Sequence, residues 1–332
     1  MKKIFFWFRN ARMVSLPQSV FPAILAVTTS MGYACFSLRY AIMAVVGVVF
    51  LHLSMNLFDD YFDYKNQNTK IRNELAENNV FARTGKCSYL TSGMANPKEL
   101  FWTATFFLTI AVILGGIIFL YRGEVILYTA LTGGVLGFSY SAKPFCLSYR
   151  GLGEITVGIM FGPLLMFGVS YAACGIYVPA VAILSLSVGL LVANILFTHS
   201  ILDYQPDKYM NKKTLAVLIK SPTVLLLLSV FLTVSPFLLV GGGILFGYLS
   251  WWYSLIMLVF PLGIYLMYLI AMFFFHPQRQ FSPCFFTRPM ENWDKIQQKG
   301  TAWFMIRWYL SRNLTMYFCI LAIVASLLSV VK

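Results

Sequence analysis

The sequence predicts an all-α polytopic membrane protein with about nine transmembrane helices, in a single domain that spans residues 1–332. Three observations predict this class. The chain is 59% hydrophobic and only 11% charged, which is far more apolar than a soluble domain. Runs of about 20 apolar residues, the length that crosses a bilayer, recur along it. The net charge of +13 comes from basic residues in the loops between those runs, so membrane lipid is an expected partner and nucleic acid is not.

The expected helices are bounded by glycine, proline or charged residues. Their ranges are 14–35, 39–60, 98–120, 123–141, 151–172, 177–198, 221–242, 246–275 and 304–331. Prolines inside these ranges are tolerated where neighbouring helices satisfy the freed backbone groups. Acidic segments end the second and the sixth helix, which are therefore parallel. That spacing predicts two four-helix repeats plus a ninth helix, a helical bundle of repeated units.

The basic residues are distributed unevenly between the two sides of the membrane. Loops on the side of the N-terminus carry almost all of them, and only Arg39, Arg122 and Lys332 fall on the other side. The positive-inside rule therefore predicts a cytoplasmic N-terminus in a bacterial inner membrane, with the C-terminus outside. The long loops, at about 61–97, 199–220 and 276–303, share the cytoplasmic side, so we expect the functional site there.

Acidic residues are concentrated at the ends of two expected helices. Five of the six aspartates occur in Asn56-Leu57-Phe58-Asp59-Asp60-Tyr61-Phe62-Asp63 and Asp203-Tyr204-Gln205-Pro206-Asp207. On a helix, Asn56, Asp60 and Asp63 share one face, and the second segment repeats the four-residue spacing. Such close carboxylates repel one another unless a cation neutralises them, and oxygen ligands favour Mg²⁺, which is usually held by a few carboxylates and substrate phosphates. Acids at a membrane boundary are costly, so we interpret them as functional rather than as solvated loop charges.

Basic and aromatic side chains in the adjoining loops could bind a diphosphate and stabilise a carbocation. The basic residues are Lys86, Lys143, Arg150, Lys208, Lys212 and Lys213. For each of them, a role in orientation alone stays equally open. Tyr61, Phe138, Tyr140, Phe145 and Tyr149 could stabilise a cation through their ring faces. We interpret His52 and His199, each four residues before an acidic-segment residue, as packing groups in preference to a proton relay.

Together these residues resemble the UbiA-type intramembrane prenyltransferase superfamily, and within it the members that prenylate 1,4-dihydroxy-2-naphthoate in menaquinone synthesis. The paired aspartate motifs of that family are similar to Asn56-x-x-x-Asp60-x-x-Asp63 and Asp203-x-x-x-Asp207. Other matching stretches are Ala11-Arg12, Leu16-Pro17-Gln18-Ser19, Pro22, Gly137-Phe138-Ser139-Tyr140-Ser141, Pro144-Phe145, Leu147-Ser148-Tyr149-Arg150-Gly151-Leu152-Gly153-Glu154, Gly162-Pro163 and Lys213-Thr214-Leu215-Ala216-Val217. The resemblance covers roughly residues 7–220, and the last third matches only in being helical.

The resemblance implies a bundle whose central cavity opens toward the cytoplasm and sideways to lipid. It implies Mg²⁺-dependent transfer of a polyprenyl group from its diphosphate to an aromatic acid, 1,4-dihydroxy-2-naphthoate, giving demethylmenaquinone. The implied metal and diphosphate ligands are Asn56, Asp60, Asp63, Asp203 and Asp207, with the four aspartates catalytic. The implied contacts to the diphosphate or to the acceptor carboxylate are Lys143, Arg150 and Lys213, and Tyr140 and Tyr149 would also contact substrate.

Three departures from the family pattern leave the acceptor open. Family members carry Asn where Asp59 stands and a further Asp where this chain has Thr69; Asp59, Glu74 or Glu77 could replace that carboxylate. His199-Ser200-Ile201-Leu202 replaces Asn-Asn-x-Arg ahead of the second motif, and loops 66–97 and 276–303 are longer than usual. The acceptor could instead be 4-hydroxybenzoate, homogentisate or a lipid glycerol phosphate. A secondary transporter is a further alternative, although its site is expected near the bilayer midplane on broken helices.

Overall fold

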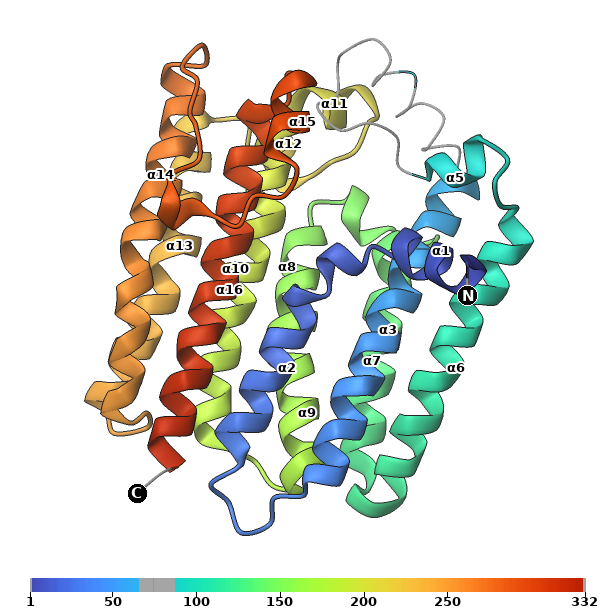
Figure 1. The fold of residues 1–332 in the computed structure, drawn as a ribbon, viewed down its shortest axis with the longest axis vertical. Helices are drawn as coiled ribbons and strands as arrows, with labels where there is room; N and C mark the ends of the chain where they lie inside the picture. The colour runs from blue at the N-terminus through green and yellow to red at the C-terminus, as the bar shows by residue number, and fades with distance from the viewer. Residues whose placement is uncertain (1, 66–73, 75–86, 331–332) are drawn as a thin grey trace.

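The computed structural model describes residues 2–65, 74 and 87–330, and these residues contain helices and no β-strand. Long helical rods run along the length of the molecule (Figure 1). They are α2 (Pro17–Ser30), α3 (Leu38–Lys65), α6 (Pro97–Arg122), α7 (Glu124–Ser141), the consecutive α8 (Gly153–Ile159), η3 (Met160–Leu164) and α9 (Leu165–Cys174), α10 (Pro179–Leu202), α13 (Pro222–Leu245), the consecutive η4 (Trp251–Val259) and α14 (Phe260–Phe275), and α16 (Ala302–Val330). The all-α class predicted from the sequence is confirmed.

Each expected helical range overlaps one of these rods. Within the described part of the chain, 7 rods are long and apolar enough to cross a membrane. The other two, α2 and α7, are shorter, with 14 and 18 residues. The chain is therefore an integral membrane protein, and the number of spans stays a prediction.

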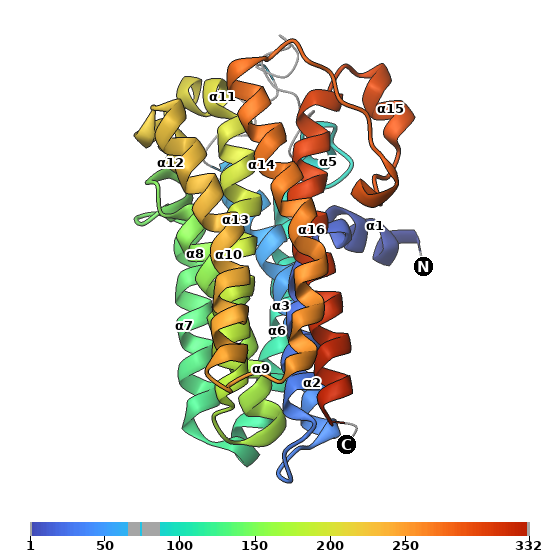
Figure 2. The same ribbon diagram turned by 90° about the vertical axis from the view of Figure 1, so that its left-hand side faces the viewer.

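The short helices lie mainly at one end of the bundle. They are α1 (Lys2–Asn10), η1 (Met13–Ser15), α5 (Ser88–Thr91), η2 (Leu147–Tyr149), α11 (Tyr204–Tyr209), α12 (Leu215–Ile219), η5 (Phe285–Thr287) and α15 (Trp293–Gln298). Of these, α5, α11, α12 and α15 gather at the end that we call the loop end, and the C-terminus lies at the opposite, far end (Figure 1). Helix α1 lies across the rods rather than along them (Figures 1 and 2).

Local sequence explains where α6 and α7 begin and end. Asn96 forms a capping box with Glu99, and Pro97 occupies the first turn of α6, where its missing N–H costs nothing. At the far end Gly123 adopts a φ of +80°, which a side chain would disfavour, and lets α7 start directly after α6. The two helices therefore form a tight antiparallel hairpin.

Glycines bring the α8–η3–α9 rod into contact with α10. A Cβ atom on Gly162 would lie 2.4 Å from the Ser185 carbonyl oxygen, and one on Gly158 would lie 2.9 Å from that of Gly189. Pro163 interrupts the α-helical hydrogen bonds in this rod, where the chain forms the π-helical turn η3. The close approach fixes α10, whose loop-end terminus carries the second acidic segment.

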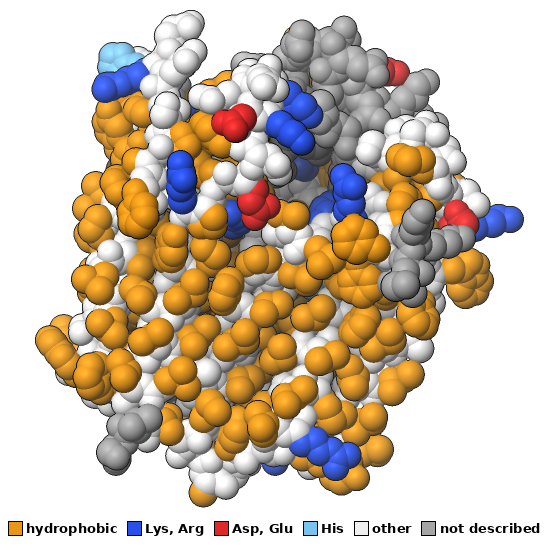
Figure 3. Space-filling view, in the orientation of Figure 1, with side chains coloured by type: hydrophobic (Ala, Val, Ile, Leu, Met, Phe, Trp, Pro, Cys, Tyr) orange, Lys and Arg blue, Asp and Glu red, His pale blue; other side chains and the backbone are white. Residues whose placement is uncertain are grey.

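Helix packing follows the same order in the two halves of the chain. In the first half α3 packs against α6 and α6 against α7; in the second half α10 packs against α13 and α13 against α14. Helix α16 contacts α2, α10 and α14. This order agrees with two four-helix units plus one helix. Hydrophobic side chains cover most of the face in Figure 3, and most of its charged side chains lie toward the loop end, as expected for a bundle surrounded by lipid.

Candidate active site

A cavity of about 1030 Å³ lies inside the bundle among α2, α3, α6, α7, α9 and α10. Its polar lining residues, which include both acidic and basic groups, are Arg12, Ser15, Gln18, Ser19, His52, Asn56, Asp59, Asp63, Thr129, Tyr140, Ser148, Tyr149, His199, Lys212, Lys299 and Thr301. The part toward the far end is apolar and rich in small residues, including Gly47, Gly115, Gly133 and Gly168. We call the charged, loop-end part the mouth. This lining suits a ligand with an anionic head and a long apolar tail.

The first acidic segment forms the last turns of α3 at the mouth. Asn56, Asp59 and Asp63 line the cavity, whereas Asp60 is only 2% exposed and is not part of the lining. At about 100° per residue, Asp59 and Asp60 lie on opposite sides of the line through Asn56 and Asp63. The helical spacing predicts that Asp60 shares one face with Asn56 and Asp63. In the structure Asp59 points toward the cavity instead, and Asp60 points toward neighbouring polar groups.

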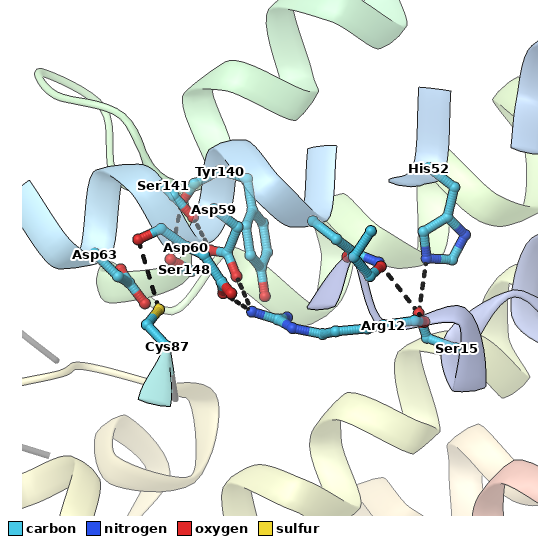
Figure 4. A network of polar contacts seen from close by, with 12 residues as sticks. Arg12, Ser15, His52, Asp59, Asp60, Asp63, Cys87, Tyr140, Ser141 and Ser148 are labelled. Carbon is cyan, nitrogen blue, oxygen red and sulfur yellow. Dashed lines mark hydrogen bonds and ion pairs between the residues drawn. The ribbon is translucent and has the colours of Figure 1, made fainter. Parts of the chain in front are cut away.

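Arg12 links the carboxylates of Asp59 and Asp60 (Figure 4). Its Nη2 atom contacts Asp60 Oδ1 and lies 3.2 Å from Asp59 Oδ2. Ser141 donates a hydrogen bond to Asp59, and the Tyr89 hydroxyl donates to Asp60 Oδ2 over 3.0 Å. Burial and the Asp60 carboxylate raise the pKa of the Tyr89 phenol, which therefore remains a donor at neutral pH. Asp60 is thus a buried carboxylate with a cationic and a neutral hydrogen-bond donor, the usual condition for burying such a charge.

Arg12 is a site residue that the sequence argument counted only as an orientation charge and as part of a matching stretch. It lies in the turn between α1 and α2, with a left-handed backbone φ of +60° that is uncommon outside glycine. The same turn is fastened to α3, because Asn56 Nδ2 donates to the Ala11 carbonyl oxygen over 2.9 Å and to Ser15 Oγ over 3.2 Å. The signals in the sequence were its position just before an expected membrane span and the matching stretch Ala11-Arg12.

The second acidic segment lies behind the wall of the mouth. Asp203 and Asp207 are each 3% exposed, and neither lines the cavity. Each contacts a residue that does: His199 Nε2 lies 3.2 Å from Asp203 Oδ2, and Lys212 Nζ lies 3.7 Å from Asp207 Oδ1. Asp203 and Asp207 therefore contact the lining of the mouth only indirectly, through His199 and Lys212.

The two acidic segments meet at the same mouth through Lys212 and Tyr149. The Lys212 ammonium lies 5.7 Å from the centre of the Tyr149 ring, and the Tyr149 hydroxyl donates to Asp63 Oδ1 over 3.2 Å. The loops that carry these residues are paired, because Lys213 N–H donates to the Tyr149 carbonyl oxygen over 3.2 Å. The structure thus brings Asp207, Lys212, Tyr149 and Asp63 into one chain of contacts across the mouth.

The expected substrate-binding residues divide into two groups. Asn56, Tyr140 and Tyr149 line the cavity. Lys143, Arg150 and Lys213 are exposed and do not line it. Arg150 instead braces its own loop by donating to the Pro144 carbonyl oxygen over 2.8 Å. In the described part of the chain, the cationic side chains that line the cavity are Arg12, Lys212 and Lys299. Of the expected diphosphate-binding lysines that the structure describes, Lys143, Lys208, Lys212 and Lys213, only Lys212 lines it.

Both histidines line the cavity, and each ring also packs against an aromatic side chain, His52 against Phe161 and His199 against Phe304, so the packing role stays a prediction. His52 lies between two serines, with Nε2 3.1 Å from Ser15 Oγ and Nδ1 2.7 Å from Ser19 Oγ. His199 contacts Asp203. The sequence shows that each histidine lies four residues before a residue of its acidic segment. It does not show that the faces of α3 and α10 that carry His52 and His199 point into the cavity.

The donor chemistry of the mouth fits a hard divalent cation. Asn56, Asp59 and Asp63 place oxygen atoms in its lining, and the carboxylates of Asp60, Asp203 and Asp207 are buried behind it. Among residues 2–65, 74 and 87–330, no group of three or more acidic, histidine or cysteine side chains is close enough to hold one ion. Mg²⁺ is usually held by one or two protein carboxylates together with substrate phosphates. Each acidic segment can supply that number of carboxylates. Lys86, Thr69 and Glu77, named above, lie outside the described residues, and Glu74 is exposed.

The comparisons with known proteins agree with this geometry. The model of the UbiA prenyltransferase family matches residues 19–287. A 1,4-dihydroxy-2-naphthoate octaprenyltransferase from Bacillus subtilis is 23% identical over 247 residues, which cover 74% of this chain and 76% of that one. A digeranylgeranylglyceryl phosphate synthase structure aligns with a TM-score of 0.64 at 18% identity, covering 98% of this chain and 99% of that one. A UbiA homologue from Archaeoglobus fulgidus bound to GPP and Mg²⁺ aligns with a TM-score of 0.56 at 16% identity, covering 95% and 99%. The match along most of its length shows that this chain belongs to the UbiA prenyltransferase family.

Proposed function

We propose that this protein transfers a polyprenyl group from a polyprenyl diphosphate to 1,4-dihydroxy-2-naphthoate, in a reaction that requires Mg²⁺. The observation that carries the proposal is the cavity itself: a mouth lined by acidic and basic groups leads into a long apolar interior. An allylic diphosphate has the matching shape and polarity. The naphthoate relative from Bacillus subtilis and the GPP- and Mg²⁺-bound homologue support this choice of acceptor, donor and cation.

The mouth offers cationic groups for the diphosphate and carboxylates for the metal ion. Arg12, Lys212 and Lys299 are positioned to neutralise the oxygens of the diphosphate. Asn56, Asp59, Asp60 and Asp63 from α3, and Asp203 and Asp207 at the end of α10, would hold Mg²⁺. When bound, the cation would stabilise the negative charge that develops on the leaving diphosphate.

The remaining steps follow from this arrangement. The C–O bond of the donor breaks, and its electron pair leaves with the diphosphate. The allylic cation that remains lies beside the Tyr140 and Tyr149 rings, whose faces are negative. A ring carbon of the acceptor then forms the new C–C bond, and the ring regains aromaticity by losing its carboxylate as CO₂. The apolar interior excludes water that would otherwise capture the cation.

The acceptor is the least constrained part of the proposal. An aromatic acid has a carboxylate that Arg12 or Lys299 can bind, and phenolic hydroxyls that can reach the Ser15, Ser19 and His52 cluster on the cavity wall. A lipid glycerol phosphate would use the same cations, and the likeness to digeranylgeranylglyceryl phosphate synthase keeps it as the second candidate. We also propose that the mouth faces the cytoplasm of a bacterium, because the basic loops surround it.

The test is a transfer assay with the purified full-length protein in lipid nanodiscs. Labelled polyprenyl diphosphate and Mg²⁺ are combined separately with 1,4-dihydroxy-2-naphthoate, 4-hydroxybenzoate, homogentisate and glycerol phosphate lipid. A labelled naphthoquinol product together with released CO₂ is the expected result. Transfer only to another acceptor would replace the naphthoate, and no transfer to any acceptor would overturn the proposal.

A further inference from the structure

One wall of the mouth lies outside the part of the chain that the family model matches. That match ends at residue 287, whereas Ile296, Lys299, Thr301, Met305 and Trp308 all line the cavity. Thr301 immediately precedes α16, and Met305 and Trp308 follow it by four and seven residues, so the three side chains share one face of the helix. The last third of the chain, which was expected to match the family only in being helical, therefore contributes its own side chains to the site.

The segment that leads into this wall is fastened to α16 through backbone carbonyl groups. Asn313 Nδ2 donates to the Thr287 carbonyl oxygen over 2.8 Å and to the Pro289 carbonyl oxygen over 3.0 Å. Arg312 Nη2 donates to the same Pro289 oxygen over 3.1 Å. Asn313 and Arg312 are both buried, so water does not compete for these hydrogen bonds. Helix α15, which follows, packs against α16 at the loop end (Figure 2).

The turn between α15 and α16 fixes the backbone of Lys299. Gly300 has a φ of +68°, and its N–H donates to the Gln297 carbonyl oxygen over 2.9 Å. Thr301 N–H donates to the Ile296 carbonyl oxygen over 3.2 Å. These two hydrogen bonds form the Schellman ending of a helix, which places a glycine in the left-handed conformation. Lys299 is exposed and lines the cavity, so its side chain lies at the rim of the mouth.

Lys299 differs in its contacts from the other two cations of the lining. Arg12 and Lys212 each form an ion pair with an aspartate of the proposed magnesium-binding set. Within the part of the chain that the structure describes, Lys299 forms no ion pair. Arg12 and Lys212 are therefore placed beside the metal ion and the diphosphate, whereas the Lys299 ammonium is available to a second anion.

The same wall offers an aromatic surface. Trp308 is half-buried, and its ring centre lies 5.7 Å from the Arg312 guanidinium and 5.2 Å from the Tyr309 ring centre, contacts that hold the indole in place. Along the axis of α16, Trp308 is about 10 Å from Thr301, at about 1.5 Å per residue. A naphthoate measures about 7 Å from its carboxylate to its far ring edge, at bonds of about 1.5 Å. With the long side chain of Lys299 at one end, one such molecule has the length to contact both Lys299 and Trp308.

We propose that Lys299, Met305 and Trp308 form the subsite for the aromatic acceptor, with the Lys299 ammonium on its carboxylate and its rings against Met305 and Trp308. The proposal rests on the proposed function, which requires an aromatic acid, and it assigns the carboxylate to Lys299 in place of Arg12. A charge-assisted hydrogen bond at one end and an aromatic contact at the other match both halves of a hydroxynaphthoate. A lipid glycerol phosphate has the anion but no ring.

Two lysines of the α15 segment allow a matched test. Lys295 lies one turn before Lys299, and it is also exposed but does not line the cavity. Within the described residues, neither lysine forms an ion pair. Lys299→Met and Lys295→Met therefore remove the same charge from the same short helix end, and only the first removes it from the proposed subsite.

The first measurement is binding, so that it does not depend on turnover. 1-Hydroxy-2-naphthoate and 1-naphthol, which differ only in the carboxylate, are titrated into nanodiscs that contain the full-length protein, Mg²⁺ and inorganic diphosphate, and binding to empty nanodiscs is subtracted. In Lys299→Met the affinity for the acid should fall about tenfold, while the affinity for the naphthol stays within about twofold. Lys295→Met should change neither affinity by more than about twofold.

The second measurement is transfer kinetics with 1,4-dihydroxy-2-naphthoate. Lys299→Met should raise KM for this acceptor about tenfold and leave KM for the polyprenyl diphosphate within about twofold. Trp308→Leu should raise KM for the acceptor about three- to tenfold, and Trp308→Phe, which keeps an aromatic ring, should recover most of that loss.

Two results would overturn the inference and leave the proposed function intact. One is an equal affinity for the acid in Lys299→Met and Lys295→Met. The other is a rise in KM for the donor in place of the acceptor, which would place Lys299 at the diphosphate. A wild-type protein that binds the acid through Lys299 but transfers a prenyl group to no acceptor would instead reject the proposed function and keep the subsite.

Discussion

Lys212 and Lys213 provide a sharp test of the site, because they are adjacent, carry the same charge and differ in position. Lys212 lines the cavity and contacts Asp207, whereas Lys213 is exposed and outside the lining. The comparison is Lys212→Met against Lys213→Met. Methionine keeps most of the aliphatic length of lysine and removes the ammonium.

The expected size of the effect follows from electrostatics. A unit charge about 4 Å from a phosphate oxygen interacts with it by about 4 kcal/mol at an effective dielectric constant of about 20. Removing one preorganised donor to developing negative charge typically lowers kcat by about 10²–10³. We expect a loss of that size in Lys212→Met and a change of about threefold or less in Lys213→Met.

Loss of fold is measured separately. The Lys212–Asp207 pair is 3.7 Å long and the Asp207 side chain is only 4% exposed, so removing Lys212 takes a cationic partner from a buried carboxylate and lowers stability as well. The assay is transfer of labelled polyprenyl diphosphate at saturating acceptor, with thermal midpoints of both variants recorded in the same nanodiscs. Lys212→Arg, which keeps the charge, should recover part of the activity. Equal activity of the two methionine variants, or greater loss in Lys213→Met, would refute the placement of Lys212 at the diphosphate.

The remaining predictions concern the carboxylates, the cation and the orientation. Asp60→Asn and Asp203→Asn should each bring transfer below detection while the protein still inserts, because each removes the charge of a proposed metal ligand. Asp294→Asn, an exposed control on α15, should keep normal activity. An active Asp60→Asn enzyme would rule out Asp60 as a metal ligand. Excess EDTA should stop transfer and added Mg²⁺ should restore it, whereas turnover that persists in the chelator would contradict the metal requirement. Cys35, exposed in the far-end loop, should react with an impermeant maleimide from outside intact cells, and labelling only after lysis would reverse the proposed orientation.

Composition and spacing predicted the helical fold well, because the bilayer leaves few alternatives. In lipid every backbone polar group must be satisfied within the chain, so a long apolar run becomes a helix. Each expected range therefore overlaps a rod, from α2 to α16. The observed ends differ by several residues where local signals were not used, as at Ser30, where α2 ends before the expected residue 35, and at Lys65, where α3 continues past residue 60.

The site was predicted less completely, because side-chain direction depends on packing. Asn56 and Asp63 line the cavity as their spacing suggested, but Asp59 lines it in place of Asp60. The two carboxylates are adjacent in sequence, and their directions differ by about 100° on a helix. Which of them faces inward depends on how α3 is rotated against its neighbours, and on Arg12 and Tyr89, which hold Asp60 away from the lining.

The sequence by itself determined the class of the protein, the location of its acidic segments at helix ends and the charge chemistry available there. These follow from local properties, namely the length of apolar runs, the helical period and the type of each side chain. Only the tertiary structure decided that Arg12 and Lys299, far apart in the chain, share one mouth with Lys212, and that Ile118 and Ile126 line the same cavity toward the far end. The reason is that a cavity is formed by the faces of several helices at once, and the rotation of each helix is fixed by its contacts with the others.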